Sequence, residues 1–512
     1  MTDIADQPGP GAALARRPLS GLATTPKLAL PVALFVLSML CPLIIDIGAL
    51  RMSPYRLVLL VMVLPCFFAV FSGRAGRVRP ADYAMLFLYI WSVIAIVFHH
   101  GLLSQIEALG IFFVETIGAY MLGRLYIRDA ASFLALVRLL FITVMIMLPV
   151  AIVEAVTGRN IIISLFEMIG RSYREANMEQ RLGFDRAQGA FQHPILFGVY
   201  CGGVIALAYF VLGYGKSFIG AAGRAGTVLL GALCCFSSGP MTAMVAQLGI
   251  IGWNVVFKSI PNRWWMLTGF AAFAWVFVDI FSNRTPPEVF IHYFALNSGT
   301  AFNRILIWEY GSKSVMSHPL LGLGFNDWPR PGWMSGSMDM YWLVVPVRYG
   351  LPAGLAMGFV FLWIFLKVAL RKGLDARLNA YRLGYLGCML GYFMVGWTVH
   401  FWNETYVVFM MIIGAGVWFL DADTQQSEAA PEEPARRPVR GLRPAARLSD
   451  GDEPTKPAPD PAAVADDAAP PAPPPLNRAR NSARGALSVR DRAERRPGGA
   501  NGFHGGGGKH PF

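Results

Sequence analysis

Residues 133–156 read FLALVRLLFITVMIMLPVAIVEAV, an apolar run in which Arg138 and Glu154 are the only charged residues. A helix that crosses a lipid bilayer needs about 20 consecutive, mostly apolar residues. The run satisfies this requirement on length and on composition. It therefore predicts a transmembrane helix.

The same pattern recurs along most of the chain. Of the 512 residues, 55% are hydrophobic and 15% are charged, whereas a soluble domain has about 25% charged residues. Further apolar runs occupy residues 28–48, 54–72, 82–99, 105–123, 193–213, 225–239, 240–257, 264–281, 340–366, 380–397 and 402–420. We therefore expect an all-α, polytopic membrane protein of about twelve transmembrane helices. The interrupted stretch 225–257 is either two short spans that meet at a turn or one broken helix.

The two ends of the chain differ from this transmembrane body, which spans residues 28–420. Residues 1–27 are rich in Pro, Ala and Gly, contain three basic residues and lack a convincing small-residue cleavage site. We interpret them as a disordered cytoplasmic N-terminus rather than a signal peptide. Residues 421–512 contain 14 basic and 13 acidic residues and no apolar periodicity. This composition predicts a disordered cytoplasmic tail, either a solvated tether or an arm that docks a partner.

The net charge of +12 follows the predicted topology. Basic residues lie in alternate loops, which the positive-inside rule places in the cytoplasm together with both termini. These residues are Arg74, Arg77, Arg79, Arg124, Arg128, Lys216, Arg224, Lys258, Arg263, Lys367, Arg371, Lys372, Arg377 and Arg382. Only the first outer turn, with Arg51 and Arg56, departs from the rule. Two long loops, 157–192 and 282–339, then lie outside, and the charge gives no reason to expect nucleic acid.

Several reaction classes lack their sequence signatures. There is no G-x-x-x-x-G-K-[ST] phosphate loop, no G-x-S-x-G elbow and no spacing typical of metal ligands. The six cysteines form no C-x-x-C pair and lie within or beside apolar runs, where they usually serve as small apolar residues. Glu115 and Arg348 fall within predicted spans and invite a functional explanation. Such charges are too few to favour a proton relay.

Chemically useful side chains gather instead in the two outer loops. Arg186 and His193 stand at or near the entrance of a span, where a guanidinium can hold a diphosphate through two parallel hydrogen bonds. Arg304 and Trp308 are four residues apart, which places them on one face of a helix. Two alternatives remain open: Arg304 forms a surface ion pair with a nearby acidic residue, and His318 only caps a turn.

Three short segments carry a resemblance to a known family. They are Arg186-Ala-x-Gly189-x-Phe191-x-His193-Pro194, then Ser237-Ser238-Gly239-Pro240, and then Arg304-x-x-x-Trp308 followed by His318-Pro319-Leu-Leu-Gly322-x-Gly324. In order, spacing and placement outside the membrane they resemble the O-antigen ligase/polymerase superfamily, which comprises bacterial polytopic glycosyltransferases. With the spans, the likeness covers residues 30–420.

The resemblance implies an enzyme of the bacterial inner membrane whose periplasmic side transfers an undecaprenyl-diphosphate-linked glycan to an acceptor hydroxyl, with no metal and no cofactor. It implies that Arg186 and Arg304 grip the diphosphate as catalytic residues. The substrate-binding positions that it implies are Arg181, His193, Trp308 and His318. Ligases have a His-Asn pair where this chain has Asp339 and Met340. An aspartate general base at this place is similar to the exopolysaccharide polymerase branch.

We therefore expect a polymerase that joins lipid-linked oligosaccharide repeats into a surface polysaccharide or exopolysaccharide. One alternative is an O-antigen ligase that moves the glycan to lipid A core or another acceptor. Another is a transporter (flippase) of lipid-linked glycans, which should show symmetric halves and polar residues along many spans; the sequence shows neither. The expected partners are the lipid-linked oligosaccharide, the lipid bilayer, and polysaccharide export or chain-length proteins.

Overall fold

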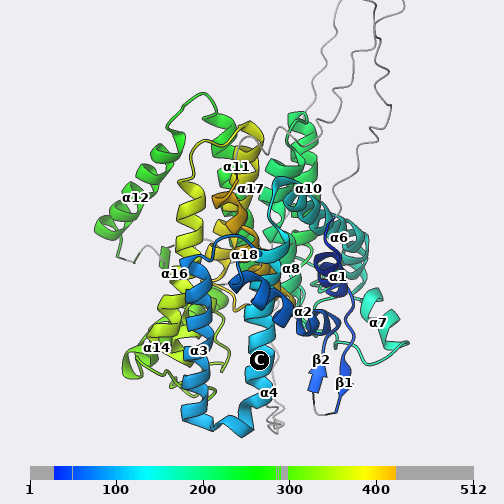
Figure 1. Ribbon diagram of the computed structural model, residues 1–512, viewed down its shortest axis with the longest axis vertical. Coiled ribbons are helices and arrows are strands. Elements are labelled where there is room, and N and C mark those ends of the chain that lie inside the picture. Colours follow the sequence, from blue (N-terminus) through cyan, green and yellow to red (C-terminus); the bar gives the residue numbers. More distant parts are fainter. Residues whose placement is uncertain (1–27, 49, 284, 286–287, 290–297, 423–512) are drawn as a thin grey trace, which may run out of the picture. The chain divides into compact units, whose positions relative to one another are not determined.

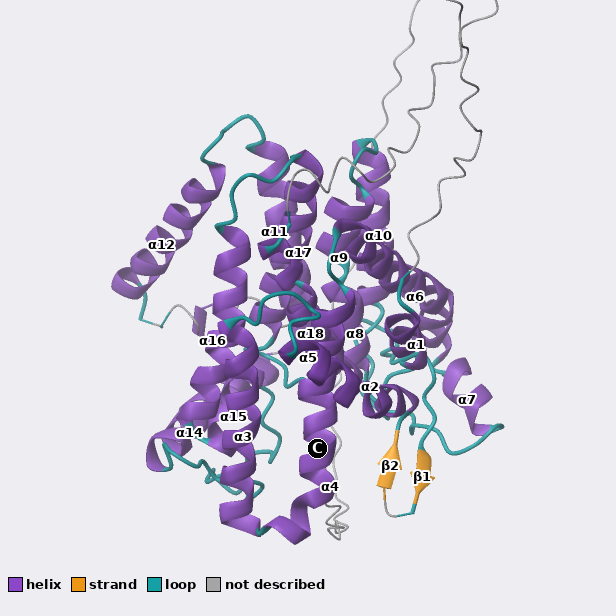
Figure 2. Cartoon of the chain, in the orientation of Figure 1, coloured by secondary structure: helices purple, strands orange, loops and turns teal. Residues whose placement is uncertain are grey.

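The computed structural model describes residues 28–422 except 49, 284, 286–287 and 290–297. In this part of the chain, helices pack against one another and almost no other regular structure occurs (Figures 1 and 2). Eight of the described helices are long and apolar enough to cross a membrane. The protein is therefore a multi-pass membrane protein, as the sequence predicted.

The first predicted span, 28–48, is not one continuous helix. Helix α1 (Leu30–Ser38) ends after 9 residues. Strand β1 (Ile45–Ile47) then pairs antiparallel with β2 (Leu50–Met52). The expectation of an all-α fold is corrected by this small hairpin, which lies beside α7 in the orientation of Figure 2.

Backbone pairing with the first long loop explains why α1 stops early. Proline cannot continue a helix interior, and Pro42 follows α1 closely. The Pro42 carbonyl accepts the backbone N–H of Tyr173 at 3.0 Å, and the backbone N–H of Ile44 donates to the Arg171 carbonyl at 2.8 Å. These bonds satisfy an extended segment that the hydropathy pattern alone assigns to a helix.

The next four predicted spans are confirmed, with small shifts at their ends. They are α2 (Pro54–Phe71), α3 (Pro80–His100), the continuous run α4 (Leu102–Phe113), η1 (Val114–Gly118) and α5 (Ala119–Tyr126), and α6 (Ala130–Thr157). Asp129 begins α6 by accepting the N–H of Ser132 at 2.7 Å. Gly158 ends α6 in the left-handed conformation, with φ 71°.

The apolar stretch at 225–257 is two helices that meet at a turn. The helices of this region are α7 (Ile161–Glu167), α8 (Pro194–Gly203), α9 (Ile205–Leu207), η2 (Ala208–Leu212), α10 (Phe218–Leu233) and α11 (Ser238–Val256). Pro240 lies in the first turn of α11, where a missing N–H costs nothing. The chain can therefore stop and restart a helix within a few residues, and the broken-helix alternative is wrong.

The predicted span 340–366 is also two helices. The remaining helices are α12 (Arg263–Phe281), α14 (Ser298–Ser317), α15 (Tyr341–Tyr349), α16 (Leu351–Ala369), α17 (Ala376–Val395), α18 (Asn403–Ala415) and η3 (Val417–Leu420). Gly350 separates α15 from α16 with φ 84°. A Cβ atom at Gly350 would lie 1.9 Å from the carbonyl oxygen of Leu320. The loop after α14 therefore packs directly on the break, and only glycine leaves room for it.

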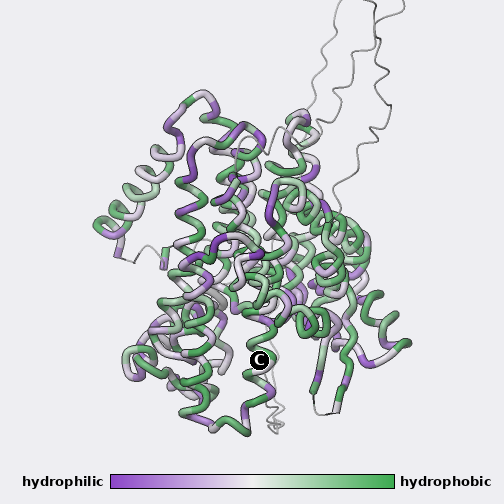
Figure 3. The backbone as a smooth tube through the Cα atoms, viewed as in Figure 1, coloured by the Kyte–Doolittle hydropathy of each residue, from purple (hydrophilic) through white to green (hydrophobic). Residues whose placement is uncertain are grey.

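Helix α18 lies inside the packed helices, whereas α12 stands at their edge (Figure 1). Every residue of α18 is buried, and α12 has no buried residue. A Cβ atom at Gly123 of α5 or Gly414 of α18 would lie 2.1 Å from a carbonyl oxygen of the other helix. This close approach is typical of helices that associate in a membrane. Hydrophobic residues also cover the outer helices, as lipid contact requires (Figure 3).

The basic loops that the sequence assigned to one side of the membrane meet in space. Arg79 forms an ion pair with Asp421, at the end of the described chain. Arg124 donates to the carbonyl of Ala75 at 2.6 Å, and its Nε lies 3.5 Å from Asp82. The start of α3, the end of α5 and the residue after η3 are therefore tied together by arginines that pair with carboxylates or donate to backbone carbonyls.

Candidate functional site

The candidate site is centred on the turn between α10 and α11. Phe236 has a left-handed backbone, with φ 43°, and its ring stacks on Phe184 of the first long loop at 5.2 Å between centroids. Ser237 and Ser238 are buried, and no side chain caps α11. The N–H groups of the first turn of α11 have no partner within the helix, and such a terminus attracts negative charge.

Two arginines of the first long loop bind this turn. The Nη1 of Arg181 donates to the carbonyl of Phe236 at 3.1 Å. The Nε of Arg186 donates to the carbonyl of Cys235 at 3.3 Å, and the Arg186 side chain is buried. Each bond uses one donor of a guanidinium that has five. Both arginines are held in place while most of their donors remain available to a ligand.

A buried carboxylate holds the loop that carries Arg186. Glu154 of α6 accepts the backbone N–H groups of Gln188 and Gly189, each at 3.0 Å, and the side-chain amide of Asn160 at 3.0 Å. Asn160 also caps α7 by accepting the N–H of Ile163 at 2.9 Å. The sequence showed Glu154 only as a charge within a predicted span, and sequence reasoning missed Asn160. An asparagine directly before an apolar run was the available signal for the cap.

Arg304 reaches the same turn from α14, which belongs to the second long loop. Its Nε donates to the carbonyl of Thr398 at 3.0 Å, and only 6% of the residue is exposed. A Cβ atom at Gly239 would lie 3.8 Å from Nη2 of Arg304 and 2.4 Å from Cγ2 of Val399. Gly239 therefore permits the close approach of both groups to the start of α11.

Arg181, Arg186 and Arg304, hereafter the arginine cluster, form a positive site without a compensating ion pair. Burial lowers the pKa of Arg186 to about 10, and the charge of Arg181 acts in the same direction. Burial likewise lowers the pKa of Arg304 to about 10. The carboxylate of Asp339 has the opposite, smaller effect, because it favours the charged guanidinium. Within the described residues, none of the three forms an ion pair with a carboxylate.

His193 adds a neutral donor beside the cluster. As the N-cap of α8, it accepts the N–H of Ile195 on Nδ1 at 3.1 Å, so its proton resides on Nε2. Burial lowers the pKa of His193 to about 4, and the charge of Arg186 acts in the same direction. The ring is therefore uncharged near neutral pH, and it can donate one hydrogen bond without adding to the repulsion between the arginines.

Asp339 and Trp308 lie near the cluster, and His318 does not. Asp339 is half-buried, accepts the hydroxyl of Ser337 at 2.5 Å and acts electrostatically on Arg304. Trp308, one turn after Arg304 on α14, makes an edge contact with Trp397 at 5.8 Å between ring centroids.

His318 follows the far end of α14. Fourteen residues separate it from Arg304, which corresponds to roughly 21 Å along a helix. Its exposed ring meets the neighbouring Ser317 hydroxyl at 3.0 Å, and its backbone carbonyl accepts the N–H of Gly322 at 3.0 Å. The structure therefore does not bring His318 to the arginine cluster, and the ring contact to Ser317 does not cap a turn of the backbone.

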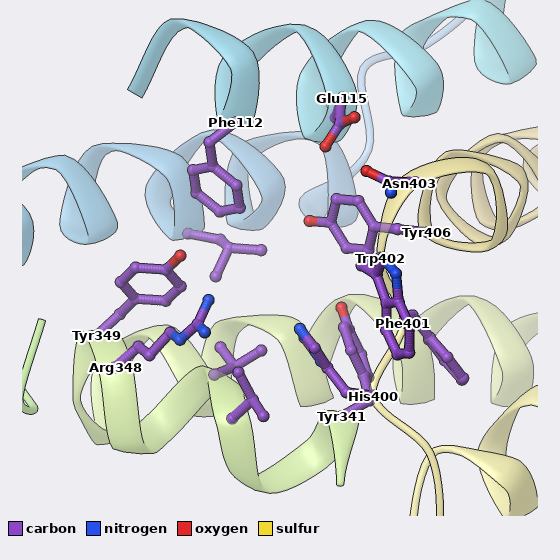
Figure 4. A pocket seen from close by; sticks show the side chains of 13 residues that line it. Phe112, Glu115, Tyr341, Arg348, Tyr349, His400, Phe401, Trp402, Asn403 and Tyr406 are labelled. Carbon is purple, nitrogen blue, oxygen red and sulfur yellow. The ribbon is translucent and has the colours of Figure 1, made fainter. Parts of the chain in front are cut away.

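The two charges that the sequence singled out within spans, Glu115 and Arg348, line one cavity of about 60 Å³ (Figure 4). Glu115 is paired with Arg56 at 2.8 Å and accepts the hydroxyl of Tyr55 at 3.0 Å. This pair explains why Arg56 departs from the positive-inside rule. His400, which sequence reasoning missed, lines the same cavity, and no local pattern around it signals a role.

No family model matches the chain. A stretch of 152 residues is 26% identical to a subunit of NADH-quinone oxidoreductase from Deinococcus deserti. The match covers 27% of this chain and 35% of that protein, so the chain spans about a third of the length of the protein that it resembles. A match of this extent does not establish a family.

Proposed function

We propose that this protein is a polymerase that joins undecaprenyl-diphosphate-linked oligosaccharide repeats on the periplasmic side of the bacterial inner membrane. The observation that supports the proposal is the arginine cluster at the first turn of α11. Three guanidiniums and a helix N-terminus form a site whose positive charge the described residues leave uncompensated. Such a site suits a diphosphate.

The proposal includes a topology of about twelve crossings with both termini in the cytoplasm. The proposed crossings are the eight apolar helices together with α10, α11 and α17. These three helices pack against other helices, so their surfaces can be less apolar than those of helices that face lipid. The proposal also adds α1 with residues 39–44, in which a turn at Met39 and Leu40 precedes the backbone pairing with the first long loop. The loop 282–339 then lies in the periplasm, between the ninth and tenth crossings.

The chemistry assigned to the cluster is a displacement at the anomeric carbon of the donor glycan. The acceptor hydroxyl attacks this carbon, and the bond between the carbon and the diphosphate oxygen breaks. Arg186 and Arg304 stabilise the charge that grows on the leaving lipid diphosphate, while His193 donates from Nε2. Asp339, as general base, takes the proton of the acceptor hydroxyl. No metal or cofactor takes part in this scheme.

The alternative that shares this chemistry is a ligase, in which the acceptor is lipid A core or another molecule rather than a second lipid-linked repeat. Asp339, at the place of the ligases' His-Asn pair, favours the polymerase. A transporter of lipid-linked glycans needs polar groups along its path through the membrane. The cluster lies instead on loops and helix ends, which favours a reaction at one membrane face.

A respiratory role is the remaining candidate, on the basis of the partial match to the NADH-quinone oxidoreductase protein. The match covers 27% of this chain. Apolar helices draw on few residue types, so part of such an identity follows from composition. The arginine cluster gives a more specific reason to propose glycan transfer.

Deletion of the gene in its own bacterium tests the proposal. Lipid-linked and surface glycans are then profiled by mass spectrometry. A polymerase predicts loss of polymer with accumulation of single repeats on undecaprenyl diphosphate. Long chains stranded on the lipid carrier would show a ligase, and an unchanged glycan profile would exclude both.

A further inference from the structure

The cavity that contains Arg348 and His400 is separate from the arginine cluster but adjoins it. It lies between the α4–η1 junction, α15 and the segment that leads into α18 (Figure 4). The same segment serves both places, because Thr398 accepts Arg304 and His400 lines the cavity two residues later. The ring of Trp402 lies 6.0 Å from His400 and 6.1 Å from His193.

Two cavity groups capable of binding an anion have no acidic partner in the described structure. Arg348 is half-buried, contacts the hydroxyl of Tyr349 and lies 5.9 Å from the ring of Phe325, and it forms no ion pair among the described residues. The buried Nδ1 of His400 has no hydrogen-bond partner there. Figure 4 shows the guanidinium and the imidazole facing each other across the cavity.

Glu115, the acidic residue that lines the cavity, does not neutralise Arg348. Glu115 is already paired with Arg56 at 2.8 Å. Asn403 ties this pair to the neighbouring loop, since its Oδ1 accepts Arg56 at 3.0 Å and its Nδ2 donates to Gln192 at 2.6 Å. Asn403 holds these bonds with φ 51°, a left-handed conformation that is uncommon outside glycine. The Arg348 side of the cavity therefore keeps a net positive charge.

Size and charge together restrict the ligand. A cavity of about 60 Å³ has room for several water molecules, and so for a small charged group. One permanent cation with Glu115 across the cavity suits a monoanion better than a phosphate dianion. Aromatic side chains line the walls, and Tyr341 stacks on His400 at 6.3 Å between centroids. Such walls suit the apolar face of a sugar.

We propose that this cavity binds the carboxylate of an acidic sugar in the acceptor glycan, with Arg348 and His400 as its ligands. The proposal deepens the proposed function and rests on it, since it names the substrate class of the acceptor. A uronic acid of the growing repeat inserts its carboxylate between the two side chains. The sugar ring packs against the aromatic walls of the cavity.

The test is ligand binding to the full-length protein purified in detergent. Methyl glucuronide, methyl glucoside and glucose 6-phosphate are compared by saturation-transfer NMR with titration. We expect the glucuronide to bind at least about tenfold more tightly than the glucoside, because a charge-assisted hydrogen bond contributes about 1.5–3 kcal/mol. Equal binding of the two, or binding of neither, would overturn the proposal. Tighter binding of the phosphate would overturn the choice of a carboxylate.

Variants locate the site. Arg348→Gln and His400→Gln should each reduce the preference for glucuronide to about twofold or less. Arg330→Gln is the matched control, because Arg330 lies in the loop before α15, does not line the cavity, and already pairs with Asp327. A preference that survives in both cavity variants would place the binding elsewhere. Thermal unfolding of each variant identifies any loss that comes from misfolding.

One further variant separates this proposal from the proposed function. Arg304→Ala should abolish polymer in cells and keep the glucuronide preference in vitro. If gene deletion leaves polymer intact while glucuronide still binds through Arg348, the enzyme assignment fails and the carboxylate site stands. If deletion removes polymer and no acidic sugar is preferred, the carboxylate site alone fails.

Discussion

Arg124 and Arg304 are buried to almost the same extent, at 3% and 6% exposure, but their surroundings are opposite. Arg124 donates to two backbone carbonyls and lies 3.5 Å from the carboxylate of Asp82. Arg304 donates to one carbonyl and has no ion-pair partner in the described structure. A buried charge normally requires a partner. The comparison indicates that Arg124 holds the helices together, and it supports the ligand role that we propose for Arg304.

The largest effect expected from this comparison is on glycan assembly. Arg304→Ala should lower polymer formation by about 10²–10³-fold, since it removes a donor that stabilises the leaving diphosphate. Protein level and membrane insertion should stay normal. Arg304→Lys should rescue only part of the activity, because a point charge replaces a two-pronged donor. Polymer is measured in a deletion strain that carries each variant; near-normal polymer from Arg304→Ala would exclude the diphosphate role.

The matched substitution, Arg124→Ala, should lower the stability of the protein rather than its activity. Arg124→Ala leaves Asp82 buried without its cation, which typically costs about 3–5 kcal/mol. We expect a lower unfolding temperature and a lower protein level in membranes. Activity per folded molecule should be unchanged. A stable Arg124→Ala protein that makes no polymer would contradict the structural role given to Arg124.

A smaller effect is expected where the backbone approaches the cluster. The Cβ of Gly239→Ala would lie 2.4 Å from Cγ2 of Val399, so the turn or the segment after α17 must shift. Such overpacking costs about 1–3 kcal/mol. Polymer formation should fall by about tenfold, as expected when a ~1.4 kcal/mol loss reaches the reacting groups. The double variant Gly239→Ala, Val399→Ala should recover most of it; absence of recovery would point to a cause other than this contact.

The smallest effect is expected at His318. His318→Ala should change polymer formation by less than about twofold, because the exposed ring meets only the adjacent Ser317 and lies far from the cluster. Polymer length and amount, resolved on a gel, are the measurement. A loss comparable to that of Arg304→Ala would return His318 to the substrate-binding set that the family resemblance implied.

Hydropathy predicted some of the helices and failed at others, and particular residues show why. Long apolar runs such as 133–156 predicted their helices to within a few residues, because burial in lipid requires length and composition that no other fold class shares. The same hydropathy pattern failed at 28–48 and 340–366. In both places a distant loop bonds to or packs on the backbone: Arg171 accepts Ile44, and Leu320 packs on Gly350. Hydropathy windows contain no information about such partners.

The candidate site divides in the same way. The sequence singled out Arg186, His193 and Arg304, because each lies in one of the short segments that carry the family resemblance. His400 was not identifiable, and Glu154 was visible only as a charge within a predicted span, since each acquires its role from groups farther along the chain. Glu154 supports the Arg186 loop through the N–H groups of Gln188 and Gly189. His400 meets Arg348 only because the segment before α18 passes α15.

The sequence by itself determined that this is a multi-pass membrane protein and which loops carry its unusual arginines, because hydropathy and charge are local properties of the chain. Only the tertiary structure decided which arginines are neutralised and which are not. Arg56 forms an ion pair with Glu115 of another helix. Arg181, Arg186 and Arg304 lie together at the start of α11, and none of them has an acidic ion-pair partner among the described residues. Whether a buried charge is compensated depends on groups within a few ångströms, and the fold brings these together from distant positions.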